Sequence, residues 1–423
     1  MPAAHRRRPS GQRGHDYGWA VLSVELFAGA GGLALGCELA GFEPAAVVEW
    51  DRWACDTIRQ NQAADYPLVR RWKVVEGDVR QADWSDVTDV DLVAGGPPCQ
   101  PFSMGGKAKA AADLRDMFPA TAEVVATLRP KAFLIENVKG LTRSSFANYY
   151  QYILMRMEMP ELVRREEETW FEHLQRLQAE HTGKSYDGLT YRVAPTVVNA
   201  ADYGVPQQRH RVFVVGFRSD LDAEWSFPAA THSYDALLHD QWVTGQYWER
   251  HQVPKSKRPE QPPRSKNRIE ALRHVEPAGL LRPWRTVRDA LVGLPEPTLA
   301  GSRGVLNHFL QPGARPYPGH TGSFIDMPAK ALKAGDHGVP GGENMLLRVD
   351  GSVRYFTIRE SARIQTFPDR YELHGSWTEA MRQLGNAVPV LLAQKVAASV
   401  AEHIVLAELR KVVADPKVVG LLA

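Results

Sequence analysis

The sequence predicts an α/β protein with a doubly wound sheet and a second, smaller, loop-rich domain. Three observations support this class. An apolar strand, Val21–Phe27, runs into a glycine-rich turn and a helical stretch, which is how a mononucleotide-binding sheet begins. Further apolar strands alternate with helical stretches through the first half of the chain. A proline-rich middle segment, 219–354, then interrupts this pattern before regular structure returns.

Length and composition indicate an intracellular globular protein. The 423 residues are enough for two or three domains, and 44% hydrophobic with 24% charged residues are ordinary globular values. No apolar run approaches the ~18 residues of a membrane helix, and the basic start is not followed by the apolar part of a signal peptide. Cys37, Cys55 and Cys99 show neither paired nor metal-binding spacing, so we expect a reducing compartment, no metal and no membrane.

Charge is unevenly distributed along the chain. The net charge is only +2, but Arg250–Arg288 holds eleven Lys/Arg against three acids, a net +8, which leaves about −6 for the remainder. Such asymmetry predicts a lobe that faces a polyanion. A solvated basic loop is the alternative.

The glycine-rich turn Ala28–Gly32 follows the first strand and opens a predicted helix, 33–40. Backbone N–H groups at a helix N-terminus favour an anionic group. The second predicted strand ends in Glu49 and Trp50. Glu49 stands 20 residues after Gly29, which is about the spacing of an acid that binds ribose hydroxyls, and Trp50 can stack on an adenine.

A third strand, 73–76, ends at Gly77-Asp78-Val79 and offers a second polar contact for an adenine edge. Acids at the ends of two strands, together with the glycine turn, predict an adenosine-bearing ligand. For Glu49 or Asp78 alone, a helix cap is the alternative.

The strand that begins at Asp91 ends in Gly95-Gly96-Pro97-Pro98, and Cys99 follows at once. Strand ends in an open α/β sheet are where ligands and chemistry are found. The glycines allow close approach to a ligand and the prolines stiffen the exit, so one thiol is held at a fixed point. We predict that Cys99 is a nucleophile; a buried structural cysteine is the alternative.

A polar stretch with glycines, 103–107, follows Cys99 and is expected to be a loop that closes over substrate. After a predicted helix, 117–128, a further strand, 131–135, ends in Glu136-Asn137-Val138. Neighbouring parallel strands would bring Cys99 and Glu136 into one cleft.

Residues 143–187 form a charged, aromatic insert, in which 160–181 has the spacing of an amphipathic surface helix. Strands are predicted at 193–199 and 212–217. Between them Gln207, Arg209 and Arg211 alternate, and an extended chain would point all three to one face.

Two guanidiniums on one face beside a cleft suit a phosphate or a base oxygen. An edge strand with solvated charges is the alternative.

The chain divides into four expected parts. Residues 1–18 are a disordered basic tail, 19–218 form the sheet domain, 219–354 form the loop-rich domain, and 355–423 return to the sheet domain. The loop-rich domain carries the basic segment together with aromatic residues: Trp242, Tyr247, Trp248 and Trp284.

The last part begins with a capped helix, 358–366, on which Arg359 and Arg363 lie on one face. Gly385–Pro389 is a predicted tight turn. A long apolar helix, 390–409, is expected to pack back on the sheet.

These residues together resemble the DNA (cytosine-5) methyltransferase family. The resemblance covers about 21–217 and 355–409, and it implies a Rossmann-like methyltransferase sheet with 219–354 as the target-recognition domain. The insert and the long middle lobe are departures. The motifs that carry the resemblance are Gly95-Gly96-Pro97-Pro98-Cys99-Gln100-Pro101-Phe102-Ser103, Glu136-Asn137-Val138, Gln207-x-Arg209-x-Arg211, Phe27-x-Gly29-x-Gly31-Gly32, Arg359-x-x-x-Arg363-Ile364-x-x-Phe367-Pro368 and Gly385-Asn386.

The resemblance implies a catalytic domain at 19–218 that uses S-adenosylmethionine and releases S-adenosylhomocysteine. Cys99 would add to C6 of a cytosine flipped out of the duplex, so that C5 attacks the sulfonium methyl. Glu136, protonated in a desolvated cleft, would donate at N3. Arg211, with Arg209 behind it, would hold O2.

Further roles follow from the same resemblance. Arg359 and Arg363 are expected to brace the two lobes. Substrate contacts are expected from Gln100, Ser103, Asn137 and Gln207. The cofactor would lie along Phe27, Ala28, Gly29, Gly31, Gly32, Glu49, Trp50, Asp78, Val79, Pro98, Met117 and Asn386.

The expected partner is double-stranded DNA, bound by a monomer in the bacterial cytoplasm, with a restriction or phage-defence partner left open. Three alternatives remain. The same fold can act on tRNA. A nicotinamide- or flavin-dependent oxidoreductase with a reactive thiol would explain Glu49 but not the basic lobe. The third is a catalytically inactive DNA-binding relative.

Overall fold

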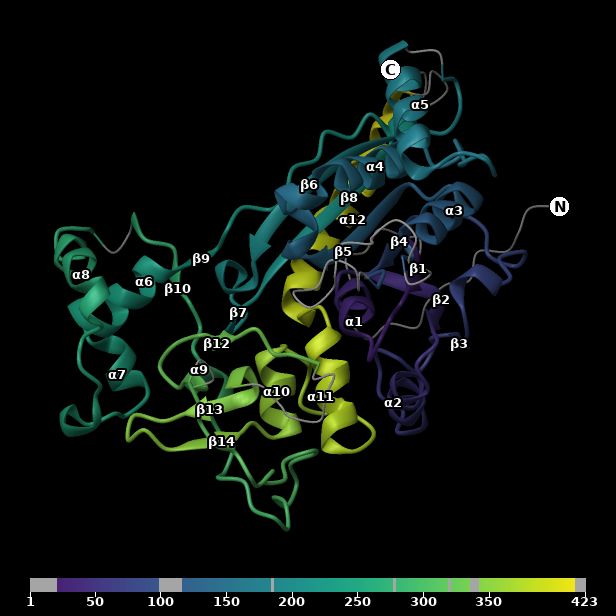
Figure 1. Cartoon of the computed structure of the whole chain (residues 1–423). Coiled ribbons are helices and arrows are strands. Elements are labelled where there is room, and N and C mark those ends of the chain that lie inside the picture. Colours follow the sequence, from purple (N-terminus) through teal and green to yellow (C-terminus); the bar gives the residue numbers. More distant parts are fainter. Residues whose placement is uncertain are drawn as a thin grey trace.

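A seven-stranded sheet forms the centre of the protein in the computed structural model, which describes residues 21–98, 116–183, 186–276, 279–318, 321–334 and 342–414. The strand order is β3-β2-β1-β4-β5-β8-β6 (Figure 1). The seven strands are β1 (Val21–Leu26), β2 (Phe42–Glu49), β3 (Val74–Glu76), β4 (Leu92–Gly95), β5 (Ala132–Val138), β6 (Tyr191–Asn199) and β8 (His210–Arg218).

This order is that of a doubly wound sheet, and it confirms the predicted fold class. From β1 the chain adds β2 and β3 on one side, and then β4 and β5 on the other, all in parallel. β8 runs antiparallel between β5 and β6. The winding therefore reverses between β1 and β4, and an open α/β sheet binds its ligand at the carboxyl ends of such strands.

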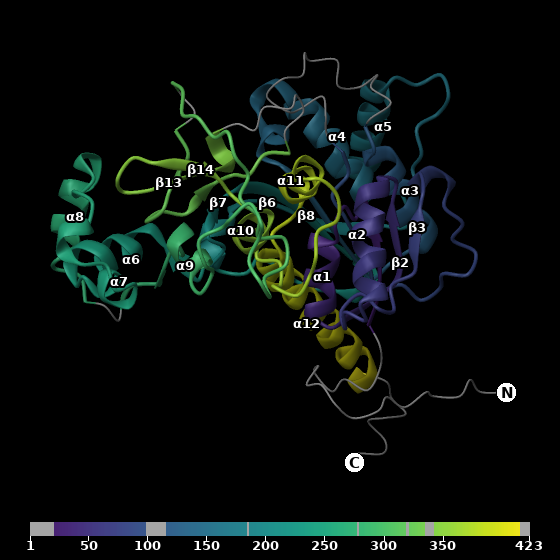
Figure 2. The ribbon, with the colours of Figure 1, turned by 90° about the horizontal axis from the view of Figure 1, so that it is seen from below.

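Helices cover both faces of the sheet (Figures 1 and 2). On one face α3, α4 and α5 share a core with Phe133 and Ile135 of β5. On the other, α1 and α12 share a core with Leu134 and Phe213. The helices of these layers and their neighbours are α1 (Gly32–Leu39), α2 (Arg52–Ala63), α3 (Phe118–Leu128), α4 (Ala147–Glu158), α5 (Trp170–Gly183), α10 (Ile358–Ile364), α11 (Trp377–Asn386) and α12 (Val390–Ala414).

One helical stretch among the described residues, Trp377–Val413, is long and apolar enough to cross a membrane. Most of its apolar window is buried inside the protein. Leu392, Val396 and Val400 of α12 lie in the core against the sheet. The apolar character of α12 is therefore explained by packing.

The segment between β8 and α10 consists mainly of loops and short helices and strands, and we call it the loop-rich lobe. Three short helices, α6, α7 and α8, gather at the left of Figure 1, away from the sheet. The buried rings of Tyr247 and Trp248 on α7 pack with Leu237 of α6. Ile269 and Leu272 of α8 pack with Leu238 of α6. The elements of the lobe are β9 (His232–Ser233), α6 (Tyr234–Leu238), α7 (Gln246–Arg250), α8 (Lys266–Leu272), β10 (Arg282–Pro283), α9 (Val287–Leu291), β11 (Ser323–Phe324), β12 (Ala329–Lys330), β13 (Met345–Leu347) and β14 (Val353–Tyr355).

Two arginines brace this lobe against the C-terminal segment, as predicted. Arg359 donates from Nε to the carbonyl of Leu306 at 3.0 Å, and Arg363 donates from Nη1 to the carbonyl of Val292 at 2.7 Å. The lobe also contacts the first part of the chain, because β12 pairs with β7 (Gln207–Gln208).

The structure differs from the predicted elements in three places. The helix predicted at 160–181 begins only at Trp170, because Arg156 holds the turn before it through three backbone carbonyls. α4 has no predicted counterpart, and its buried Tyr149 and Tyr152 place the expected insert partly in the core. The predicted tight turn begins as the last turn of α11, because Gly385-Asn386 is helical. The expected tail, 1–18, lies outside the described residues.

Candidate active site

The register of the parallel strands brings their carboxyl ends level at one edge of the sheet. Gly95 of β4 pairs with Leu26 of β1 and with Ile135 of β5. A Cβ atom built on Gly96 would lie 3.4 Å from Oε2 of Glu136. The sheet thus places the Glu136 carboxyl beside the exit of β4, as the strand order predicts.

Glu136 is buried against Arg211. Its side chain is 8% exposed, and Nε of Arg211 lies 2.7 Å from Oε1. Oε1 is buried, and this ion pair with Arg211 is its polar contact among the described residues. Burial raises the pKa of Glu136, while the charges of Arg211 and Arg209 oppose the rise. The net effect of these surroundings is a pKa of Glu136 above its ordinary value.

Asn137 fixes the chain that leaves β4. Its Nδ2 donates to the carbonyl of Pro97 at 3.0 Å, and its Oδ1 accepts from the backbone N–H of Val138 at 2.8 Å. The end of β5 therefore holds the segment that leads to Cys99. The predicted residues Cys99, Gln100 and Ser103 lie outside the described residues.

Gln207 and Arg209 are fully buried, so the alternative of a solvated edge strand is wrong. Arg209 donates to the carbonyls of Leu332 (3.1 Å), Gly385 (2.7 Å) and Ala387 (3.0 Å). Of the three alternating side chains, Arg211 is the one that contacts Glu136, whereas Gln207 and Arg209 hold the neighbouring chain.

The glycine turn and Glu49 form one unit at the ends of β1 and β2. Gly29 has φ +55°, and its N–H donates to Oε2 of Glu49 at 2.7 Å. Oε1 accepts from the backbone N–H groups of Trp50 (2.9 Å) and Asp51 (2.7 Å), and burial raises the pKa of this carboxyl. Phe27 also has a positive φ, +53°, which is strained for an aromatic residue and typical of functional turns.

The other predicted cofactor residues differ in burial and in their partners. Trp50 is 70% exposed. Asp78 caps a short 3₁₀ helix and pairs with Arg80, which lowers the pKa of Asp78; the cap alternative is therefore confirmed for this residue. The remaining residues are Ala28, Gly31 and Gly32 in the turn into α1, buried Val79 and Met117, half-buried Pro98 and exposed Asn386.

Three observations fit an adenosine-bearing ligand at this edge. Among the described residues, the space beyond Gly29 and Gly77 is open, since a Cβ atom at either would meet no atom of that part of the chain within 4 Å. The Trp50 ring offers an exposed surface for stacking. Glu49 stands at the end of β2, where ribose hydroxyls are bound in sheets of this kind.

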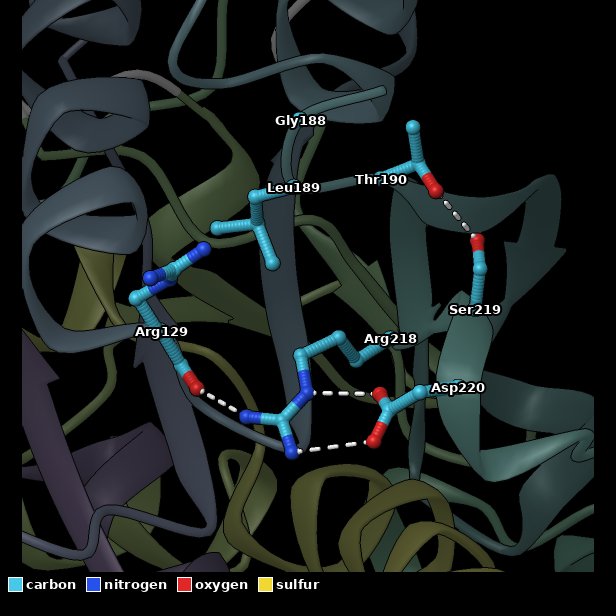
Figure 3. A pocket seen from close by; sticks show the side chains of 7 residues that line it. All are labelled: Arg129, Gly188, Leu189, Thr190, Arg218, Ser219 and Asp220. Carbon is cyan, nitrogen blue, oxygen red and sulfur yellow. Dashed lines mark hydrogen bonds and ion pairs between the residues drawn. The ribbon is translucent and has the colours of Figure 1, made fainter.

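A surface hollow of about 430 Å³ lies at the opposite edge of the sheet (Figure 3). Arg218 pairs with Asp220 there and donates to the carbonyl of Arg129, and Thr190 donates to Ser219. Because these groups satisfy one another at the amino end of β5, we do not assign chemistry to the hollow.

Two residues near the site are not singled out by sequence reasoning. Gln365 is fully buried and accepts from Nε2 of Gln207 at 3.0 Å. Leu332 of the loop-rich lobe donates its N–H to Oε1 of Gln207 at 2.9 Å. The sequence signal for Gln365 is weak: it is a polar residue between two motif positions, Arg363 and Phe367.

The model of the C-5 cytosine-specific DNA methylase family matches residues 21–160, 172–288 and 313–402. The match includes the Glu136–Arg211 pair, the glycine turn and the C-terminal segment. Within the expected insert at 143–187, only 161–171 lies outside it.

Several curated relatives are similar over most of their length. The type II methyltransferase M.PspPI of Psychrobacter sp. is 32% identical over 88% of this chain and 76% of its own. M.Eco47II of Escherichia coli is 32% identical over 89% and 78%, respectively. M.NgoPII of Neisseria gonorrhoeae is 30% identical over 89% and 94%.

Solved structures share the fold. A DNA modification methyltransferase encoded within an E. coli prophage aligns with a TM-score of 0.53 and 20% identity, covering 90% of this chain and 99% of its own. The S. pombe Dnmt2 methyltransferase aligns with a TM-score of 0.51 and 18% identity, covering 90% and 98%.

Proposed function

The chain belongs to the C-5 cytosine-specific DNA methylase family, and from this premise we propose that it transfers a methyl group from S-adenosylmethionine to C5 of a cytosine within a specific sequence of double-stranded DNA. The observation that carries the proposal is the buried Glu136–Arg211 pair beside the exit of β4. A protonated carboxyl and a fixed guanidinium can bind one edge of a pyrimidine, at N3 and O2. Family membership gives the oxidoreductase alternative no support.

In the proposed reaction Cys99 is the nucleophile. Its thiolate adds to C6, which raises the electron density at C5. Glu136 supplies a proton at N3, and its raised pKa supports this role. After methylation a base, which water can provide, removes the proton from C5. Elimination at C6 then releases the Cys99 thiolate, and N3 returns its proton to Glu136.

Asn137, Gln207 and Arg209 are proposed to act by positioning. Their amide and guanidinium groups are bound to the backbone or to Gln365. This pattern favours placement of the Cys99 segment and of the strand that bears Arg211 over direct contact with the base.

S-adenosylmethionine is proposed to lie along the carboxyl ends of β1, β2 and β3. The exposed ring of Trp50 suits the adenine, and Glu49 suits the ribose. Phe27 and Asn386 are proposed to line the remainder of the site. When bound, the cofactor supplies an electrophilic sulfonium methyl.

Double-stranded DNA is proposed to bind the loop-rich lobe, with the target base flipped out toward Glu136. Of the eleven cations in 250–288, five are held by carboxylates or backbone carbonyls. Six others are exposed and, among the described residues, have no carboxylate within ion-pair distance: Lys255, Lys257, Arg264, Lys266, Arg282 and Arg285. These six are the candidates for phosphate contacts.

We also propose that the chain is the DNA-modifying enzyme of a type II restriction-modification system. The relatives named above are type II methyltransferases, which supports methylation of a short recognition sequence in the compartment that holds the genome, the bacterial cytoplasm. A monomer on DNA remains our expectation.

Labelling separates these proposals from the tRNA alternative. Purified chain is incubated with methyl-labelled S-adenosylmethionine and either a random duplex DNA library or tRNA. We expect label in the duplex, and bisulfite sequencing should place 5-methylcytosine at one short motif. Label in tRNA alone, or in DNA bases other than cytosine, would contradict the proposed substrate.

A further inference from the structure

A buried polar cluster joins three parts of the chain behind the Glu136–Arg211 pair. Its centre is Gln365, the residue that follows α10. Oε1 of Gln365 accepts from Nε2 of Gln207, and Nε2 of Gln365 donates to the carbonyls of Leu384 and Ala387, the latter at 3.3 Å. The amide therefore uses both its acceptor and its donor side.

Arg209 completes the cluster. It donates to the carbonyls of Gly385 and Ala387, and also to that of Leu332. The last carbonyls of any helix lack partners within the helix. At the end of α11 two side chains from elsewhere, Gln365 and Arg209, supply these partners.

The segment they hold, Leu384–Val388, is here called the α11 exit turn. A Cβ atom at Gly32 would lie 2.5 Å from the carbonyl oxygen of Val388, so the turn packs directly on the start of α1. A Cβ atom at Gly385 would lie 2.2 Å from the backbone nitrogen of Ala334, so the loop-rich lobe packs on its other side. The turn is thus wedged between the proposed cofactor edge and the proposed DNA lobe, and it carries Asn386.

We infer that Gln365 is a positioning residue for methyl transfer. It holds the α11 exit turn in a fixed position relative to the strand that carries Arg211. The bound cofactor and the flipped base therefore keep a fixed position relative to each other. An apolar side chain cannot replace it, because the carbonyl of Leu384 and the Nε2 of Gln207 would lose a buried partner, and Ala387 would keep only the hydrogen bond from Arg209. This inference rests on the proposed function.

The test compares Gln365→Met with a matched control, Gln241→Met. Gln241 is also buried, and its Nε2 donates to the carbonyl of Asp326 at 2.7 Å within the loop-rich lobe. The readouts are the dissociation constant for S-adenosylhomocysteine by calorimetry, the melting temperature, and kcat and KM for S-adenosylmethionine.

We expect Gln365→Met to weaken S-adenosylhomocysteine binding and to raise KM for S-adenosylmethionine by roughly tenfold, the effect of losing well-placed hydrogen bonds. kcat should fall as well, because the base and the methyl donor lose their common geometry. Gln241→Met should lower the melting temperature but leave both cofactor constants within about twofold.

A third variant, Gln365→Glu, covers the case in which Gln365→Met does not fold. It keeps an acceptor for Gln207 but turns an oxygen toward the carbonyls of Leu384 and Ala387. We therefore expect weaker S-adenosylhomocysteine binding and a higher KM for S-adenosylmethionine, as for Gln365→Met. Wild-type cofactor affinity in the folded Gln365 variants, or an equal defect in Gln241→Met, would overturn the inference. If the wild type binds S-adenosylhomocysteine yet methylates no DNA, the proposed function fails while the affinity comparison still decides the role of Gln365.

Discussion

Nε of Arg211 on β8 lies 2.7 Å from Oε1 of Glu136 on β5, and both side chains are almost entirely buried. The contact exists because antiparallel β8 pairs its first residues with the last residues of β5, with Arg211 opposite Val138. Burial favours the neutral carboxyl and the cation favours the charged one, and burial has the larger effect. The pair therefore places a carboxyl group with a raised pKa and a guanidinium at the edge where the parallel strands end.

Glu136→Gln should lower kcat by about 10²–10⁴-fold, because the amide fills the same space but cannot transfer a proton to N3. Binding of S-adenosylhomocysteine should change little. Single-turnover methylation of duplex DNA measures the effect. The matched control is Glu25→Gln, which alters another buried carboxyl in the same sheet and should leave kcat unchanged. Full activity in Glu136→Gln would remove the proposed acid.

Asn137→Ala should lower kcat by about tenfold, since the carbonyl of Pro97 loses its donor and the segment leading to Cys99 loses its support. Asn61→Ala is the control, because Asn61 is also buried and also bridges backbone groups, those of Thr57 and Glu372. Comparable stability loss in both variants, with a kcat defect in Asn137→Ala alone, is the expected result. Equal kcat values would refute the positioning role.

Cys99→Ser should abolish methylation and leave cofactor affinity within a few-fold of wild type, because a hydroxyl is a far weaker nucleophile than a thiolate. DNA with 5-fluorocytosine at the target should trap a covalent complex with the wild-type chain, visible as a shifted band in a denaturing gel. Turnover by Cys99→Ser, or an active preparation that traps no complex, would exclude Cys99 as the nucleophile.

Lys255→Ala/Lys257→Ala should weaken DNA binding and reduce the slope of log K against log salt by about 2, if each lysine contacts one phosphate. Both lysines are exposed and, in the described part of the chain, neither has an ion-pair partner. The control variant, Glu270→Ala/Arg273→Ala, removes an existing ion pair without changing net charge. A salt titration monitored by fluorescence anisotropy distinguishes them, and equal slopes would exclude this basic turn from the interface.

Glu25 predicts a pH dependence of stability that is separate from catalysis. Burial raises its pKa from 4.5 to about 7, against a hydrogen bond from Ser23. Because the folded state prefers the neutral acid, this stabilising contribution is complete below pH 4.5, declines as pH rises and is lost near pH 7.

Glu25→Gln should therefore gain up to about 3 kcal/mol in free energy of unfolding relative to wild type between pH 4.5 and pH 8. Urea titrations at the two pH values measure the difference. A stability gap that is the same at both pH values would show that Glu25 does not titrate in this range.

The sequence by itself determined the sheet, its strand ends and the identity of the chemical groups. Strands and helices are encoded in short windows: β1, β4 and β5 fall where their apolar runs predict. Placement of Glu136 beside the exit of β4 also followed, because consecutive parallel strands in such a sheet tend to be neighbours. The helix α4 could also have been predicted, because its buried residues recur at helical spacing, but it lies in a segment with many charged residues.

Only the tertiary structure decided which partner each polar group takes. Gln207 and Gln365 are 158 residues apart, and Arg209 and Gly385 are 176 apart. No local pattern encodes such pairs, because they depend on how the loop-rich lobe and the C-terminal segment pack on the sheet. Alternation predicts one face for Gln207, Arg209 and Arg211. In the structure Arg211 contacts Glu136, Arg209 binds backbone carbonyls, and Gln207 binds Gln365 and the backbone of Leu332.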